Sequence, residues 1–264
     1  MINRSKALKG STDLAKCAIK WLNSFIPGIN KWNEPLNDDF LGKITSSIHR
    51  RSESKKNQKK PISGQILGSI LGSSDLNNVI EVRDCLVLLL CFSLLLRHDE
   101  ISHISCDHIQ RQEGGFKILI PKSKTDQFRN GRHVFLAENV SPRSPANLLQ
   151  RYLEESGLSL GTNHFLFCPL KRSGRSLSAS NTALSYSTYR EIVRKSISKI
   201  GLDPKEFGTH SGRAGGATSL AMKVSEHELL VSGRWKDARS IRSYVQLTDE
   251  HRLSTNSLLQ SCWD

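Results

Sequence analysis

The longest run of apolar side chains lies between Cys85 and Leu96 and is twelve residues long. A helix needs about twenty apolar residues to cross a bilayer, so a run of this length favours a helix buried in a protein core. We expect the core helix to extend over residues 81–96 and to hold Arg97 at its carboxyl end. The run therefore indicates a sizeable core and a fixed position for one arginine.

Helical periodicity also marks the N-terminal part, over about residues 11–50. A weaker apolar face predicts a second helix there, over 37–49. The Pro27-Gly28 pair ends the first helical pattern. The apolar face of that first helix is formed by Leu14, Ala18, Trp21, Leu22 and Phe25.

A basic stretch follows this helical segment. Residues 50–60 contain six cations and one glutamate, a composition that buries little surface, and 51–61 is therefore predicted to be an extended linker. The stretch is suited to contact DNA phosphates, and equally to act as a solvated tether or an import signal. A second domain is expected over 62–264.

Alternating apolar residues predict a small sheet in this second domain. The glycine pair 114–115 turns the chain into a strand over 116–120, and 133–136 is the returning strand after a polar loop. Ser63 is expected to cap a helix that ends near Gly72. Further helices are predicted over 145–155, 187–200, 211–223, 225–231 and 238–245. These elements indicate a mainly α fold with a small antiparallel β-sheet, in the α+β class.

The charge balance adds a partner class to this picture. The chain has 264 residues with 38 Lys and Arg against 25 Asp and Glu, a formal net charge of +13. Such an excess favours binding to a polyanion, with nucleic acid first and an anionic membrane second.

The cysteines and the N-terminus bear on the compartment. The six cysteines form no C-x-x-C pair, and two of them lie in the leucine-rich run, where a free thiol behaves as a small apolar side chain. The first residues lack the apolar stretch of a secretory signal. We expect a reduced, intracellular protein.

Two arginines are candidates for holding a phosphate. Arg97 lies in Leu-Arg-His-Asp-Glu, and Arg213 lies three residues after His210 in His-Ser-Gly-Arg. A guanidinium group forms two parallel hydrogen bonds to a phosphate and stays charged at neutral pH. Cleavage of a phosphodiester places negative charge on several oxygens at once, which such groups stabilise.

Tyr244 is the candidate nucleophile, nine residues after Trp235. A phenol has an unperturbed pKa of about 10, and nearby cations favour its ionised form. Basic residues precede Tyr244, whereas the sequences around the other three tyrosines lack this setting. Attack on phosphorus would form a phosphotyrosyl bond and conserve the bond energy, so that rejoining needs no ATP.

The departing alkoxide needs a proton, and Lys124 in the polar loop is the candidate general acid, with Lys122 as its rival. His210 would bind the phosphate or transfer a proton. Trp235 donates a hydrogen bond but cannot act as an acid or base. The residues expected to contact DNA outside this catalytic set are Arg50, Arg51, Lys55, Lys56, Lys59, Lys60, Lys122 and Arg234.

Together these residues resemble the tyrosine recombinase family, the phage-type integrases, and the resemblance covers about residues 62–245. Arg97 with Glu100 resembles the first arginine of the family and the acidic residue that supports it, and Lys124 resembles the lysine of its β-hairpin. The family's remaining catalytic motif is matched by His210-x-x-Arg213, Trp235 and Tyr244.

The resemblance implies a DNA breaking-and-rejoining catalytic domain over 62–264, preceded by a partial core-binding, DNA-clamping segment over 1–50. It implies site-specific recombination or integration of DNA, such as that of a mobile element, through a 3′-phosphotyrosyl intermediate without a metal or other cofactor. The expected partners are double-stranded DNA and further copies of the chain, as a dimer or tetramer. The expected location is intracellular and DNA-associated, in the nucleus if the host is eukaryotic.

Two alternative functions stay open. The first is a catalytically degenerate DNA-binding domain of the same fold, and the second is an enzyme resembling type IB topoisomerases. A zinc site is a weaker interpretation: His98, His103, Cys106 and His108 lie close in sequence, but the five-residue spacing of His98 and His103 does not stack them on one helical face. The glycines 212, 215 and 216 are not followed by the Gly-Lys-Ser/Thr of a P-loop, and we expect them to allow close approach of DNA or of a neighbouring helix.

Overall fold

The chain forms two units, Met1–Gln58 and Lys59–Asp264. The structure is a computed structural model that describes residues 58–122, 131–173, 176–179 and 181–246, together with residues 14, 15, 17, 18, 21, 22, 25, 47, 253, 256, 257 and 260. In the first unit, the described residues between 14 and 22 are helical, and the rings of Trp21 and Phe25 meet edge to face with centroids 4.7 Å apart. Apart from residue 47, the helix predicted over 37–49 lies outside the described residues, and so do the cations at 50–56.

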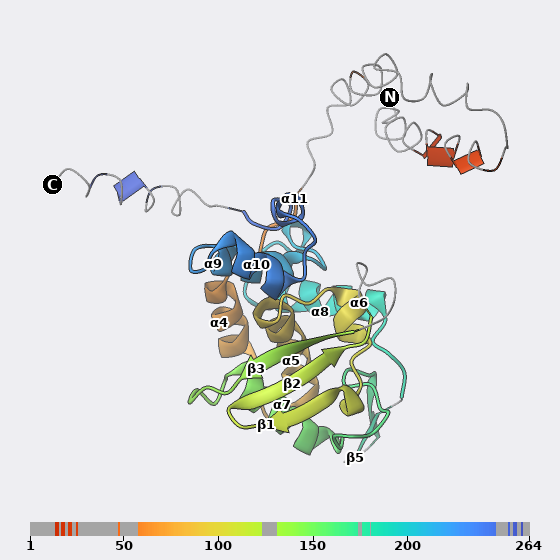
Figure 1. The fold of residues 1–264 in the computed structure, drawn as a ribbon. Coiled ribbons are helices and arrows are strands. Elements are labelled where there is room, and N and C mark those ends of the chain that lie inside the picture. The colour runs from red at the N-terminus through yellow and green to blue at the C-terminus, as the bar shows by residue number, and fades with distance from the viewer. Residues whose placement is uncertain are drawn as a thin grey trace, which may run out of the picture. The chain divides into compact units, whose positions relative to one another are not determined.

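Helix α5, Val79–Ser93, forms the centre of the second unit, and α4, α7, α8 and α9 contact it (Figure 1). Asn78 caps its first turn, and the leucine-rich run makes it buried on most of its surface. The helix ends at Ser93, three residues before the predicted end. Leu95 adopts a left-handed conformation with φ of 50°, which breaks the helical path. Arg97 follows the carboxyl end of α5 after three further residues, Leu94 to Leu96, and it is the N-cap of a short helix, α6, His98–Ser102.

The predicted hairpin is confirmed as part of a three-stranded antiparallel sheet in the order β1-β2-β3. Its strands are β1, Ile109–Gln112, β2, Gly115–Ile120, and β3, Arg132–Ala137. Phe116, Ile118 and Ile120 point into the core, as their alternation predicted. Strand β1 was missed because only its first residue is buried, and a second pair of strands, β4, Leu170–Ser173, and β5, Ser176–Ala179, was missed as well.

Serines begin most of the remaining helices. The side chains of Ser63, Ser144, Ser185 and Ser225 each accept a hydrogen bond from the first turn of the helix that follows. The helix α11 is shorter than predicted and ends before Tyr244. The helices are α4, Gly64–Ser73, α7, Pro145–Ser156, α8, Tyr186–Lys199, α9, Ser211–Ala221, α10, Glu226–Gly233, and α11, Ala238–Ile241, with single 3₁₀ turns at Cys106–His108 and Pro204–Glu206.

Two hydrophobic clusters hold the second unit together. The larger joins α4, α5, α7, α8 and the inner face of the three-stranded sheet, and the smaller joins α9, α10 and α11 around Leu95 and Trp235. In Figure 1 the three-stranded sheet lies at one end of the unit, away from α9, α10 and α11. Within the described part of the chain, no helix is both long and apolar enough to pass through a membrane.

Glycines bring α9 against its neighbours. A β-carbon on Gly216 would collide with the carbonyl of Phe92 in α5, and one on Gly215 would collide with the carbonyl of Ile62. Of the two roles expected for these glycines, close approach of a neighbouring helix is therefore confirmed for Gly216. The close contact sets the start of α9, and with it Arg213, beside the end of α5.

Candidate active site

The carboxyl end of α5 collects two arginines from distant parts of the chain. The last carbonyl groups of a helix have no partner within the helix, and a cation there also interacts favourably with the helix dipole. Arg213 donates through Nη1 to the carbonyl oxygen of Leu95. Arg234 donates to the same oxygen over 2.9 Å and to the carbonyl oxygen of Leu94 over 3.2 Å. The break after α5 thus serves as an acceptor for both guanidinium groups.

Glu100 joins these two arginines to Arg97. Its carboxylate is 1% exposed and accepts from Nη1 of Arg97 over 2.6 Å and from Nη2 of Arg234 over 3.0 Å. The Nη1 atom of Arg213 lies 3.8 Å from it. The backbone N–H of Arg97 also donates to the Glu100 carboxylate, over 2.9 Å, which pairs one of the donors at the start of α6. One carboxylate therefore holds three guanidinium groups.

Arg213 faces the aromatic residues of the candidate site on its other side. Its guanidinium carbon lies 4.6 Å from the ring centroid of Trp235 and 5.0 Å from that of Tyr244, within cation–π range of both. Nη2 of Arg213 donates to the carbonyl oxygen of Gly233 over 2.6 Å, and a β-carbon on that glycine would collide with the Trp235 ring. This packing fixes Arg213, which is 1% exposed, between the end of α5 and the rings.

Tyr244 lies in the turn after α11 and is half-buried. Its ring centroid is 5.5 Å from that of Trp235 and 6.2 Å from that of His210, the N-cap of α9. The backbone N–H of Tyr244 donates to Ile241, and its carbonyl accepts from the Thr218 hydroxyl at 3.4 Å. The turn thus brings the phenol beside Arg213, although the sequence predicted a continuous helix there.

Two other tyrosines occupy settings in which ionisation is disfavoured. Burial raises the pKa of Tyr152 and of Tyr189 well above the ordinary range of a phenol. The Tyr152 hydroxyl donates to the carbonyl of Leu166 over 3.0 Å, and that of Tyr189 to the sulfur of Cys91 over 3.2 Å. Both are structural hydroxyls within the core.

The arginine cluster carries a net positive charge in a buried setting. Arg97, Arg213 and Arg234 bring three positive charges, and Glu100 brings one negative charge, which leaves +2. Burial and the charge of Arg97 lower the pKa of Arg213 to about 10, at which it is still protonated at neutral pH. Burial opposes ionisation of Glu100, but the three arginines and the Arg97 N–H outweigh it and lower the pKa of Glu100 below the ordinary value. An anion is the ligand that such a cluster favours.

Unpaired donors mark the same place. Among the described residues, the buried side-chain nitrogens without a hydrogen-bond acceptor are Nε of Arg213, Nε of Arg234 and Nε1 of Trp235. Buried polar groups are paired in most proteins, so a cluster of unpaired donors indicates a site for an acceptor-rich ligand. Phosphate oxygens accept from guanidinium and indole groups.

The other residues expected at the site are only partly described. Lys124 lies outside the described residues, as do Arg50, Arg51, Lys55 and Lys56. Lys122 is exposed after β2. Lys59 donates to the carbonyl of residue 205 over 2.5 Å, and Lys60 forms an exposed ion pair of 2.8 Å with Glu206.

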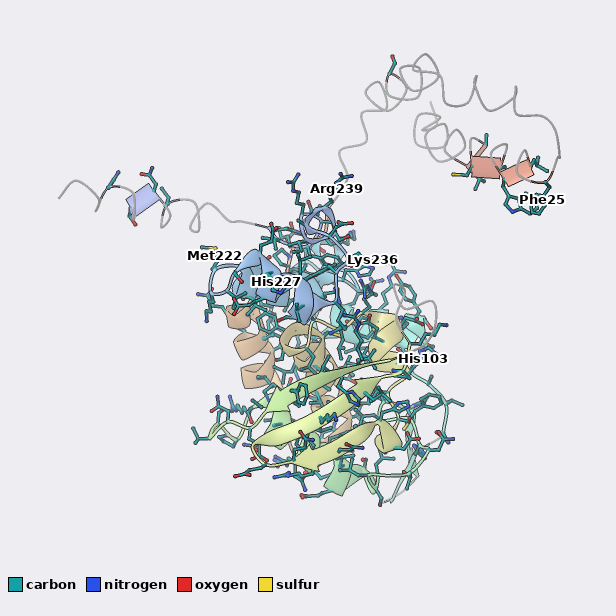
Figure 2. The ribbon with its side chains drawn as sticks, in the orientation of Figure 1. Phe25, His103, Met222, His227, Lys236 and Arg239 are labelled. Atoms are coloured by element: carbon teal, nitrogen blue, oxygen red, sulfur yellow. The ribbon has the colours of Figure 1, made fainter. Side chains whose placement is uncertain are left out.

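Among the described residues expected to contact DNA, Arg234 is buried, with 5% of its surface exposed, whereas Lys59, Lys60 and Lys122 are exposed. Its neighbours Lys236 and Arg239 are exposed (Figure 2). No local sequence signal marks this difference, because the carbonyls that Arg234 binds lie about 140 positions away, in the leucine-rich run.

The side chains weighed for a zinc site have other contacts. His98 packs edge to face on Tyr189 with centroids 5.0 Å apart, and His103 lies 3.6 Å from the carboxylate of Asp99. The Nδ1 atom of His108 accepts from the backbone N–H of Ser105 over 3.1 Å. Over the described residues, no group of three or more histidine, cysteine or acidic side chains is arranged to hold a metal ion.

Comparison with known proteins identifies the family of this chain. Residues 67–251 match the model of the phage integrase family. A homologue of the integrase/recombinase XerD from Selenomonas ruminantium is 26% identical over 230 residues, which cover 85% of this chain and 64% of the relative. The Cre recombinase of Escherichia phage P1 is 24% identical over 189 residues, which cover 68% of this chain and 54% of the relative. The chain therefore spans about half to two-thirds of the length of these relatives.

Solved structures show the same fold. The site-specific recombinase XerH in a post-cleavage complex with palindromic difH substrate has a TM-score of 0.59 and 19% identity, covering 76% of this chain and 52% of that one. The recombinase XerA has a TM-score of 0.57 and 16% identity, covering 83% and 74%. These neighbours confirm the expected mainly α fold with a small antiparallel sheet.

Proposed function

Since this chain belongs to the phage integrase family, we propose that it is a DNA recombinase that cleaves and rejoins strands through a covalent 3′-phosphotyrosyl intermediate. One observation carries the proposal: the buried Arg213 guanidinium lies 5.0 Å from the Tyr244 ring and shares Glu100 with Arg97. The contacts bring the residues at positions 97, 213 and 244 to one place, which supports their proposed roles as two phosphate-binding groups and a nucleophile.

In the proposed reaction, the Tyr244 phenolic oxygen attacks the phosphorus of a DNA backbone linkage. The new bond joins that oxygen to phosphorus, and the bond from phosphorus to the 5′ oxygen breaks. Arg97 and Arg213 stabilise the charge on the phosphate oxygens, and Trp235 donates from its indole nitrogen. The positive charge of the cluster also favours the phenolate form of Tyr244.

The leaving 5′ oxygen takes up a proton and becomes a hydroxyl. We assign the general acid to Lys124 and a phosphate contact or proton transfer to His210, whose ring lies 6.2 Å from that of Tyr244. Rejoining reverses the step: a 5′ hydroxyl attacks the phosphotyrosyl bond, and the phenol is released. The arginines supply the charge stabilisation, and the retained bond supplies the energy, so the proposed cycle requires no metal ion or ATP. Double-stranded DNA and further copies of the chain are the proposed partners.

The test is covalent trapping on a nicked suicide substrate, in which the short 5′-hydroxyl fragment diffuses away and prevents rejoining. We expect a protein–DNA adduct with the wild-type chain and none with Tyr244→Phe. Tyr186→Phe is the matched control, because Tyr186 is an exposed tyrosine in α8, and it should form the adduct at the wild-type rate. An adduct that persists in Tyr244→Phe would contradict the assignment of the nucleophile.

Arginine variants separate catalysis from simple DNA binding. Arg97→Ala and Arg213→Ala should abolish the adduct while leaving much of the salt-sensitive DNA affinity, which arises mainly from phosphate contacts over the whole interface. A wild-type chain that binds DNA but forms no adduct would instead be a catalytically degenerate DNA-binding domain. Relaxation of supercoiled plasmid without joining of two marked sites would indicate topoisomerase-like activity.

A further inference from the structure

We propose that Arg234 is a positioning residue that holds Glu100 and the end of α5, and thereby fixes the two phosphate-binding arginines, Arg97 and Arg213. The proposal rests on the proposed function for its catalytic consequence, and on contacts within the chain for the positioning itself. It assigns to the Nη atoms of Arg234 a role in holding other groups of the chain, whereas the basic sequence context suggested only a DNA contact; the unpaired Nε is left for a phosphate oxygen.

The contacts of Arg234 reach the surroundings of both arginines. Its Nη2 atom donates to Glu100 over 3.0 Å, and the other oxygen of that carboxylate accepts from Arg97 over 2.6 Å. The same Nη2 donates over 2.9 Å to the carbonyl of Leu95, which is also an acceptor of Arg213. One buried guanidinium therefore shares one acceptor with each of the two phosphate-binding groups.

The backbone conformation of Arg234 also supports a positioning role for its side chain. Its φ of 56° is in the left-handed region, which side chains larger than glycine adopt at a cost. It is the C-cap of α10, and glycine is the residue that such a cap favours. An arginine at this position therefore carries the conformational cost of the left-handed backbone. Its side chain offsets that cost with four hydrogen bonds, to Leu94, Leu95, Glu100 and Ser232.

Charge gives Arg234 a second effect on the site. Without it, Glu100 would face only two cations, and the cluster would fall from a net charge of +2 to +1. The carboxylate would then be shared between Arg97 and Arg213 alone and would compete more strongly with a phosphate for both. We therefore expect Arg234 to affect the rate of cleavage more than the affinity for DNA.

The experiment measures single-turnover cleavage of the nicked substrate at saturating DNA, alongside the dissociation constant for intact DNA. Arg234→Met removes the charge and the donors and keeps most of the side-chain length. We expect the rate of cleavage to fall about ten-fold or more, because small displacements of reacting groups slow a reaction strongly. The dissociation constant for DNA should change by less than about three-fold. An equal loss of rate and affinity, or an unchanged rate, would overturn the proposal.

Two further variants separate positioning from stability. Arg234→Gly relieves the left-handed backbone while removing the side chain, so a purely backbone role predicts normal cleavage and the proposal predicts slow cleavage. Arg83→Met is the matched control: Arg83 is also buried and bonded to a carboxylate and a carbonyl, at Asp84 and Cys168, but it lies about 15 Å along α5 from the site end. It should leave the cleavage rate of the folded protein unchanged.

A double-mutant cycle tests whether Arg234 acts through Glu100. In a Glu100→Gln background, the additional Arg234→Met change should slow cleavage much less than it does in the wild-type background, because the shared contact is already weakened. Effects that multiply independently would show that Arg234 does not act through Glu100 and would overturn that part of the proposal.

A spectroscopic measurement without DNA distinguishes failure of this proposal from failure of the proposed function. The Nε–H resonances of Arg97 and Arg213 should shift in Arg234→Met and stay in place in Arg83→Met. If the wild-type chain forms no adduct, the proposed function fails. If, in addition, the Arg97 and Arg213 resonances do not shift in Arg234→Met, the positioning role of Arg234 fails as well. Shifted resonances in such an inactive chain would support it.

Discussion

Replacing Glu100 with glutamine should destabilise the protein strongly, because the change removes the carboxylate charge that faces three guanidinium groups, of which those of Arg213 and Arg234 are buried. The nitrogen–oxygen distances are 2.6 Å to Arg97, 3.0 Å to Arg234 and 3.8 Å to Arg213. At an effective dielectric constant of about 20, a pair of charges 3 Å apart interacts by about 5 kcal/mol. Burial of the carboxylate opposes this attraction, and breaking a buried ion pair costs about 3–5 kcal/mol in measured cases.

We therefore expect Glu100→Gln to lower the free energy of unfolding by about 3–5 kcal/mol at pH 7, measured by urea denaturation. The matched control is Glu138→Gln, which removes a carboxylate from a surface ion pair of 2.5 Å with Arg111. Exposed pairs contribute about 0–1 kcal/mol, so the control should be nearly neutral.

The pH dependence provides a second, independent check. The pKa of Glu100 is lowered in the folded protein, so its stabilisation is complete above the unfolded-state pKa of about 4.3 and is lost as pH falls through the folded-state value. Glutamine does not titrate, and the difference in stability between wild type and variant should narrow as pH falls below about 4. A difference below about 1 kcal/mol at pH 7, or one that does not change with pH, would refute this account of the cluster.

Three smaller predictions concern buried contacts within the second unit. Gly216→Ala should destabilise the protein by about 1–3 kcal/mol in thermal or urea unfolding, because the new methyl group meets the Phe92 carbonyl; Gly68→Ala, with open space around it, should not. Tyr152→Phe should cost about 1–3 kcal/mol, because the Leu166 carbonyl loses its buried donor, and an unchanged midpoint would contradict that bond. Burial raises the pKa of the Cys91 thiol to about 12, so Cys91 in the native protein at pH 8 should resist alkylation. The exposed Cys17 should react under the same conditions, and peptide mass spectrometry can distinguish the two. Rapid labelling of Cys91 in the native protein would contradict its burial.

Local sequence patterns were sufficient for elements that have a clear face or cap. The alternation at Phe116, Ile118 and Ile120 predicted β2, and serines such as Ser63 marked helix starts that the structure confirms. Strand β1 escaped because Gln110, Arg111 and Gln112 are polar and exposed, which leaves no alternation to read. It owes its pairing to β2 and not to its own sequence.

The candidate site was predictable as a set of residue types but not as an arrangement. Arginine, histidine, tryptophan and tyrosine at these spacings indicated phosphate chemistry, and Arg213, Trp235 and Tyr244 lie together. The left-handed conformations of Leu95 and Arg234 had no sequence signal, since neither is a glycine. Both depend on contacts between segments well over a hundred positions apart, and a local pattern cannot report such contacts.

The shared acceptor at the end of α5 has a consequence for biosynthesis. Leu95 is made early, but the guanidinium groups that bind its carbonyl come from positions 213 and 234, so a growing chain cannot complete this cluster until most of it has left the ribosome. A product that stops before position 233 would leave Glu100 without one of its cations and Trp235 missing from the smaller hydrophobic cluster. Early termination before this point should therefore yield chains that fail to fold, and not stable fragments of the second unit.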